Sequence, residues 1–140
     1  MRRAVITGMG IVSPIGNNTN EVLASLREAK SGITYAPEFE EHGLRSHVQG
    51  KPEIDFDDLV DRKARRFMGD GVAYNYVAME QAIADSGLED SDVSNERTGI
   101  VMGSGGPSLK NIVLSVDTAR EKSVKRIGPF MVPRVMSSTN

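Results

Sequence analysis

Residues 4–18 read AVITGMGIVSPIGNN, and this opening stretch decides the fold class. Residues 4–6 form an uninterrupted apolar run, which is typical of a β-strand that is covered on both faces. Three glycines and Pro14 follow, so the run leads directly into a turn where the backbone can approach a neighbouring element closely. The stretch therefore predicts a buried strand that ends in a glycine turn.

A nucleotide-binding loop is the main alternative for such a turn. The dinucleotide fingerprint has three spaced glycines and then opens a helix. Counting from Gly8, the second glycine is present as Gly10, but Ser13 and Pro14 occupy the places of the third glycine and the helix start. No strand ending in Asp or Glu follows about 20 residues later, where a ribose contact would be needed. The sequence therefore argues against a dinucleotide site.

The opening stretch resembles the N-terminal strand and turn of the β-ketoacyl-acyl-carrier-protein synthases, the condensing enzymes of fatty acid synthesis. Further segments resemble the family in register along the whole chain: EVLASLR at 21–27, SGIT at 31–34, DRK at 61–63, RFM at 66–68, MEQAIAD at 79–85, GSGG at 103–106 and GP at 128–129. The segments at 61–68 and 103–106 are closer to the bacterial type I synthase than to type II. The resemblance implies the N-terminal part of a thiolase-like layered α/β fold with a largely parallel sheet, incomplete within this chain.

Composition bounds the class of protein. With 140 residues and 39% apolar content, the chain has the size and core of one ordinary domain. Its 17 basic and 19 acidic residues give a net charge of −2, so there is no overall attraction to nucleic acid or to an anionic membrane. No apolar run approaches the ~20 residues of a membrane span, and no secretion signal opens the sequence. We therefore expect a cytoplasmic protein.

The chain has no cysteine, which removes disulfides and thiolate metal sites. The family resemblance implies a cysteine nucleophile, two histidines and a lysine, all of which would lie beyond residue 140. His42 and His47 match no catalytic position and are expected in solvated loop. Residues 135–140 carry no stop signal, so we expect about the first third of a larger ketosynthase domain, with no catalytic residue in it.

Periodicity predicts alternating helices and strands, which favours an α/β layered fold. The stretch 37–55 is expected to be surface loop, with one short strand at most at 46–49. Helix 70–86 should stop at Gly87 and bury one stripe of apolar residues. That stripe consists of Val72, Tyr76, Met79 and Ile83. Two other helices are expected, one capped by Asn18 or Asn20 and ending at Lys30, and one opened by Asp57 or Asp58 and reaching Met68. Further helices are expected from Pro107 to a charged loop at 120–126 and near Pro129 or Pro133, with a second buried strand at 98–102.

Gly106 and Met136 are candidate pocket residues. The GSGG turn follows a predicted strand, where open α/β sheets place ligands, although small residues there can also simply allow close packing. The resemblance implies that this turn borders the acyl chamber near a dimer contact, where Gly106 leaves volume. It also implies that Met136 reaches across that contact to line the partner's pocket. The alternative for Met136 is an ordinary core methionine.

The predicted helix at 57–68 has an unusually basic face. Its four cations, Arg62, Lys63, Arg65 and Arg66, lie opposite the apolar stripe. Such a face is usually just solvated, but like charges three or four residues apart repel, and a solvating face normally mixes signs. The cluster therefore suggests an anionic partner.

The resemblance implies that this partner is an acidic acyl carrier protein bearing acyl or malonyl groups. Lys63 and Arg66 stand where the family docks it. Lys122 and Lys125 resemble a second pair of docking cations, although a one-residue deletion between Ile112 and Lys122 departs from the family pattern. Nucleic acid is disfavoured as the partner, because no stacking aromatic residue or binding motif accompanies the cluster.

The predicted function follows from the resemblance. The full-length protein would condense an acyl-enzyme with malonyl-acyl-carrier protein as a homodimer, without a cofactor or metal. A noncatalytic partner subunit, like the chain-length factors that pair with a ketosynthase, is an alternative that a cysteine-free chain also fits. A piece of a polyketide ketosynthase is a third reading.

Overall fold

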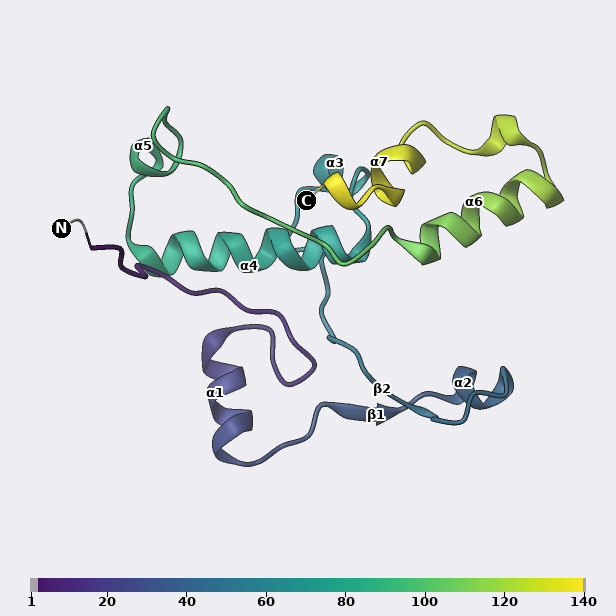
Figure 1. The fold of residues 1–140 in the computed structure, drawn as a ribbon, viewed down its shortest axis with the longest axis horizontal. Helices are drawn as coiled ribbons and strands as arrows, with labels where there is room; N and C mark the ends of the chain where they lie inside the picture. The colour runs from purple at the N-terminus through teal and green to yellow at the C-terminus, as the bar shows by residue number, and fades with distance from the viewer. Residues whose placement is uncertain (1–2, 140) are drawn as a thin grey trace. The chain divides into compact units, whose positions relative to one another are not determined.

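The computed structural model describes residues 3–139, which divide into two compact units. The first unit contains the residues up to Asp55 and Ala78–Gly87, and the second contains Phe56–Val77 and the residues from Leu88 onward. Figure 1 shows the elements in chain order. They are α1 (Thr19–Arg27), β1 (Ile33–Tyr35), α2 (Pro37–Glu41), β2 (Val48–Gly50), α3 (Arg62–Arg65), α4 (Asp70–Ser86), α5 (Asp90–Val93), α6 (Leu109–Glu121), η1 (Val124–Arg126), α7 (Met131–Val135) and η2 (Ser137–Thr139).

In the first unit, α1 begins where the sequence predicts. The side chain of Asn18 accepts a hydrogen bond from the backbone N–H of Glu21 at 3.0 Å. The Glu21 carboxylate in turn accepts from the backbone N–H of Asn17 at 2.8 Å. Each side chain thus satisfies a backbone donor at the helix start, which has no partner within the helix. The helix ends at Arg27, three residues before the predicted end.

The only sheet in the described part of the chain is small. Strands β1 and β2 pair antiparallel, with Ile33 opposite Gly50 and Tyr35 opposite Val48 (Figure 1). The short strand expected at 46–49 therefore exists at Val48–Gly50, but the surrounding stretch also holds helix α2, which the loop prediction missed. The predicted parallel sheet is not confirmed.

The two segments predicted as buried strands are not strands in this structure. Residues 4–6 are extended chain without strand pairing, and Val5 and Ile6 are 79% and 86% exposed. Residues 98–102, in the second unit, are likewise unpaired, and Val101 is 96% exposed. A strand covered on both faces needs neighbouring strands and covering layers, and residues 3–139 supply neither for these segments.

The glycine turn lies against α4 within the first unit, as its predicted role of close approach requires. A Cβ added to Gly10 would overlap the carbonyl oxygen of Ala78 and lie 2.9 Å from the backbone nitrogen of Ala82. The turn is also tied to the helix by side chains, because Asp85 accepts from the N–H of Met9 at 2.9 Å. The Gln81 side chain accepts from the backbone N–H of Ile11 at 3.1 Å and donates to the carbonyl oxygen of Asn17 at 2.7 Å. The glycines therefore serve helix packing.

Helix α4 confirms the predicted element from Asp70 to Ser86. Gly87 follows with φ of +65°, a left-handed conformation that glycine adopts without strain. The buried face differs from the predicted stripe, whose members are only half-buried. Its most buried residues are Ala73 and Val77, at 0% and 4% exposure. Each follows a predicted stripe residue by one position, which turns the buried face by about 100° around the helix.

In the second unit, the helix predicted at 57–68 is reduced to the single turn α3. The Asp61 side chain accepts from the backbone N–H groups of Lys63 and Ala64 at 2.9 and 3.1 Å, so the helix starts later than expected. Just before this turn, the ring of Phe56 pairs with that of Tyr74, with centroids 5.4 Å apart. The rings of Phe67 and Phe130 meet edge to face with centroids 5.0 Å apart.

Helices α6 and α7 pack against each other in the second unit. Helix α6 starts after Ser108, whose backbone N–H donates to the carbonyl of Val135 at 3.0 Å. Two large apolar residues of α6 are exposed, Leu109 at 71% and Val113 at 57%. The charged loop expected at 120–126 is instead the end of α6 followed by η1, whereas the final helical piece is confirmed as α7.

Candidate functional site

The basic face predicted on residues 57–68 is built on α3. Because Asp61 fixes the start of this helix, Lys63 lies within it and Arg66 forms its C-cap. Both side chains are exposed, and within residues 3–139 neither forms an ion pair. The two cations are three positions apart on helical backbone, so they point toward the same side of the turn. The structure therefore presents Lys63 and Arg66 together to solvent.

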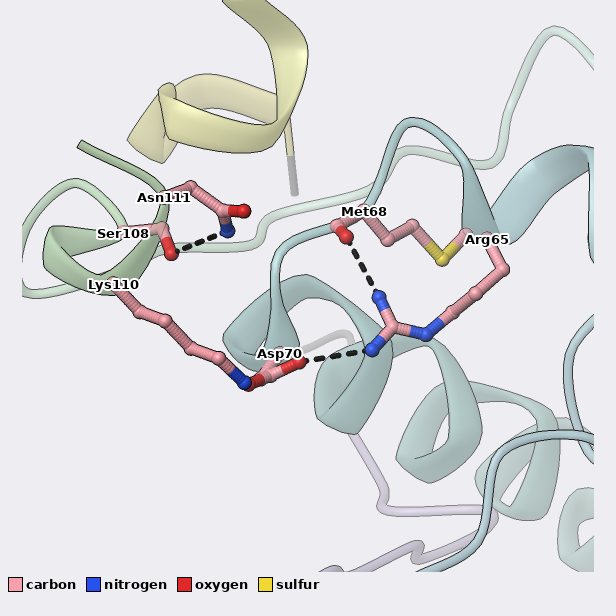
Figure 2. Close-up of polar contacts among 6 residues, drawn as sticks. All are labelled: Arg65, Met68, Asp70, Ser108, Lys110 and Asn111. Atoms are coloured by element: carbon pink, nitrogen blue, oxygen red, sulfur yellow. Dashed lines mark hydrogen bonds and ion pairs between the residues drawn. The ribbon is translucent and has the colours of Figure 1, made fainter. Parts of the chain in front are cut away.

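Arg65 does not belong to this solvated face, which corrects the sequence prediction. Its guanidinium donates to the carbonyl oxygen of Met68 at 2.7 Å and to Asp70 Oδ1 at 2.8 Å (Figure 2). The same group lies 4.8 Å from the centroid of the Phe56 ring, in a cation–π arrangement. Arg65 thus holds the segment between α3 and α4 in place, and the exposed cluster is reduced to three cations.

Asp70 connects α3 to α6 at the start of α4. Besides Arg65, the Asp70 carboxylate accepts from Lys110 Nζ at 3.0 Å (Figure 2). Partial burial of Asp70 opposes its ionisation, but the hydrogen bonds and charges of Lys110 and Arg65 outweigh burial and hold the pKa of this carboxyl below its usual value. The position in the first turn of a long helix favours the same ionised form.

The second predicted pair of cations lies at the other end of α6. Lys122 forms the C-cap of this helix and Lys125 lies in η1, and both side chains are exposed. Lys122 also lines an open hollow of about 760 Å³ together with Thr118, Ser123 and Arg126. The structure therefore adds Arg126 to this basic segment, a residue that the sequence prediction had placed in the charged loop without a role.

Gly106 and Met136 line one hollow of about 300 Å³ in the second unit, although 30 positions separate them. The hydrogen bond from Ser108 to Val135 holds the two segments together. A Cβ on Gly106 would meet no atom within 4 Å, so close packing does not require glycine there. Met136 is 47% exposed and is not an ordinary core methionine in this structure.

The wall of this hollow is mixed rather than apolar. Val72, Pro107 and Leu109 contribute apolar surface, whereas Asp70, Lys110 and Arg134 contribute charge. Gly69, which the sequence analysis did not single out, is a buried part of the wall, where a Cβ would lie 2.9 Å from the carbonyl oxygen of Arg134. Its place directly before the acidic start of α4 is the one signal that could have drawn attention to it.

The two histidines belong to the first unit, whereas the candidate site residues belong to the second. His42 caps the C-terminus of α2, and a ring nitrogen of His47 lies 2.8 Å from the carbonyl oxygen of Leu44. The side chain of His42 is exposed, as expected for a solvated position, whereas that of His47 is half-buried. Among residues 3–139 no cluster of three or more acidic or histidine side chains could hold a metal ion. No helix in that range is long and apolar enough to cross a membrane.

Comparison with known proteins gives consistent matches over nearly the whole chain. Residues 1–139 match the family profile described as beta-ketoacyl synthase, N-terminal domain. The chain is 51% identical to 3-oxoacyl-[acyl-carrier-protein] synthase 1 of Haemophilus influenzae and 50% identical to the protein of that name from Escherichia coli K12. Each alignment covers 99% of this chain, which spans about one third (34%) of the length of these relatives. A solved beta-ketoacyl synthase from Burkholderia phymatum matches with a TM-score of 0.83 and 27% identity, over 99% of this chain and 35% of that one.

Proposed function

Since the chain belongs to the beta-ketoacyl synthase N-terminal domain family, we propose that the full-length protein elongates fatty acyl chains by decarboxylative condensation. The observation that carries this proposal is the 50–51% identity to two proteins named 3-oxoacyl-[acyl-carrier-protein] synthase 1. Their shared name agrees with the type I branch that the sequence predicts. Because the chain spans about one third of their length, much of the chemistry belongs to segments outside it.

The proposed reaction has two covalent stages. An enzyme thiolate attacks an acyl thioester and releases the carrier thiol, which leaves the acyl group on the enzyme. Malonyl-carrier protein then loses carbon dioxide, and the resulting carbanion attacks the acyl carbonyl. The enzyme thiolate leaves, and the carrier holds a β-ketoacyl group two carbons longer. This chain has no cysteine, so the nucleophile and its assisting histidines and lysine would lie in the remaining part of the protein.

We assign a scaffolding role to the two apolar segments that lack strand pairing here. In the full-length protein, residues 4–6 and 98–102 would become strands of a largely parallel sheet, covered on both faces. Their composition and their exposure in residues 3–139 support this, because Val5 and Val101 are too apolar to be left at 79% and 96% exposure. The chain would then be the N-terminal part of one thiolase-like domain.

Lys63, Arg66, Lys122 and Lys125 are proposed as the dock for an acidic acyl carrier protein. All four side chains are exposed, and they form two pairs on separate elements, α3 and the α6–η1 junction. Cations without carboxylate partners attract an anionic surface at long range and guide its approach. The dock places the carrier without taking part in the chemistry.

Gly106 and Met136 are proposed as part of the acyl-pocket wall. The support is that both line one hollow and that glycine leaves open space around residue 106. An unbranched methionine adapts its shape to chains of different length. In a homodimer, Met136 would contribute to the pocket of the partner subunit, and its 47% exposure leaves it accessible to such a contact.

The protein is proposed to act in the cytoplasm.

A direct assay tests the proposed function. The purified full-length protein, given acyl- and malonyl-carrier protein, should release carbon dioxide and form a β-ketoacyl product. The 140-residue chain alone should do neither, since it has no thiol. A full-length protein that forms no product by itself, but activates a separate synthase on mixing, would be a partner subunit of the chain-length-factor kind and would refute the proposal.

A further inference from the structure

The second unit contains a hollow of about 560 Å³ whose wall is rich in arginine. We call it the arginine hollow. Three of its arginines come from α3 and the C-cap of that helix, and the fourth comes from α7, so distant parts of the chain converge on one space. The wall consists of Phe56, Asp57, Val60, Arg62, Arg65, Arg66 and Arg134.

The charges around this hollow do not balance. Asp70 compensates Arg65, and Asp57 places one further carboxylate in the wall. Arg62, Arg66 and Arg134 form no ion pair within residues 3–139. Positive charge therefore exceeds negative charge in a half-open hollow, whose wall includes one buried apolar side chain, Val60 at 5% exposure. Low-dielectric walls of this kind strengthen the attraction for an anion.

Arg134 carries the observation that points to a ligand. Its Nε is shielded from solvent and has no hydrogen-bond acceptor in the described part of the chain. Buried donors almost always have an acceptor, so an exception calls for a partner that completes it. Arg134 lines both the arginine hollow and the hollow of Gly106 and Met136. An anion in the arginine hollow would accept from Nε and the neighbouring Nη once the guanidinium turns this edge toward it.

The shape of the donors favours phosphate over carboxylate. One guanidinium edge satisfies both oxygens of a carboxylate, whereas a phosphate group has further oxygens for a second and third arginine. Arginines on two elements suit such a tetrahedral anion, because each can donate to a different oxygen. We propose that the arginine hollow is a phosphate-binding site, with Arg134 as its central donor and Arg62 and Arg66 completing it.

This site goes beyond the proposed carrier dock, and the two share only Arg66. Lys63 belongs to the dock and is not part of the hollow's wall. Arg134 belongs to the hollow and is not part of the proposed dock. Binding of phosphate itself requires no carrier protein, so a failed docking experiment leaves the phosphate measurement unaffected.

Calorimetric titration of the full-length protein with inorganic phosphate at low ionic strength tests the proposal. Phosphate should bind the parent, and Arg134→Gln should weaken it by at least about tenfold, the usual effect of losing charge-assisted hydrogen bonds. Arg134→Lys keeps the charge but loses the planar fork, so its affinity should lie closer to that of Arg134→Gln. Lys125→Gln, which removes an exposed cation outside the wall, should bind phosphate like the parent.

Further arms distinguish the source of the phosphate and the kind of anion. Dimethyl phosphate represents a diester carried on a larger molecule, and comparison with inorganic phosphate tells which form the site prefers. If Arg134→Gln lowers the melting temperature, Arg62→Gln replaces it and should also weaken phosphate binding. The proposal is overturned if the parent binds no phosphate, if Lys125→Gln weakens binding as much as Arg134→Gln, or if acetate binds as tightly as phosphate.

Discussion

Reversing the charges of Lys63 and Arg66 tests the carrier dock most directly. Both side chains are exposed and lack a carboxylate partner in residues 3–139, so Lys63→Glu with Arg66→Glu removes no ion pair from the described part of the chain. An exposed ion pair contributes about 0.2–1 kcal/mol, and reversal adds a repulsion of similar size, so the double variant should weaken docking by about 1–4 kcal/mol. At ~1.4 kcal/mol per factor of ten, KM for carrier-bound substrate should rise by about fivefold to several hundredfold.

The assay compares two substrates in the full-length protein. KM for acyl- and malonyl-carrier protein should rise, whereas turnover of a small uncharged thioester should stay unchanged. Salt should reduce the difference between parent and variant, because screening shortens the reach of exposed charges to about 8–10 Å. Arg45→Glu with Lys51→Glu is the matched control, since it makes the same change in net charge at exposed positions of the first unit. If both double variants raise KM equally, or if neither does at low salt, the dock reasoning is refuted.

Three further outcomes are expected. Gly106→Phe or Met136→Trp should slow the condensation of long acyl substrates about tenfold more than that of short ones, because overpacking costs ~1–3 kcal/mol. An equal loss of rate at every chain length would instead indicate that both residues have only a structural role. Gly10→Ala should lower the free energy of unfolding in urea by ~1–3 kcal/mol or more, because the added Cβ overlaps a backbone carbonyl of α4. Gly71 lies in α4 itself with open space around it, so Gly71→Ala should be neutral or slightly stabilising. Similar effects of the two substitutions would contradict the packing argument. The lowered pKa of Asp70 predicts a contribution to stability that is complete above the unfolded-state pKa and is lost as pH falls through the lower folded-state pKa. Asp70→Asn should therefore flatten the pH dependence of the urea midpoint in acid. An unchanged pH dependence in this variant would contradict the proposed role of Asp70.

Elements with local signals could be predicted from the sequence. Helix α4 has an acidic first turn and a glycine stop, and both lie within or beside the helix itself. The start of α1 is likewise set by Asn18 and Glu21, three residues apart. The sequence also predicted that the glycine turn approaches another element closely, because glycine has no side chain to prevent it. Its target, the backbone of Ala78, was not, since that contact joins segments far apart in sequence.

The errors arise where the outcome depends on partners outside the segment. A helical wheel assigned Arg65 to solvent, because the wheel contains neither Phe56 nor Asp70, the two residues that hold its guanidinium. The apolar runs at 4–6 and 98–102 have strand composition, but strand pairing needs neighbours that residues 3–139 do not supply. At the candidate site, the family resemblance pointed to Gly106 and Met136, whereas Arg134 had no sequence signal and became visible only through its unsatisfied Nε.

The exposed apolar segments have a consequence for synthesis on the ribosome. In a protein of the relatives' length, about twice as many residues as this chain contains would still have to be made after Val101 has emerged. At about 5–20 residues per second, the nascent chain would present residues 4–6 and 98–102 without their neighbours for tens of seconds. Unpaired, apolar and uncharged segments are the ones that aggregate or recruit chaperones during such a delay. Depletion of a holding chaperone should therefore reduce the yield of folded protein in the cell more than it reduces the stability of the finished protein.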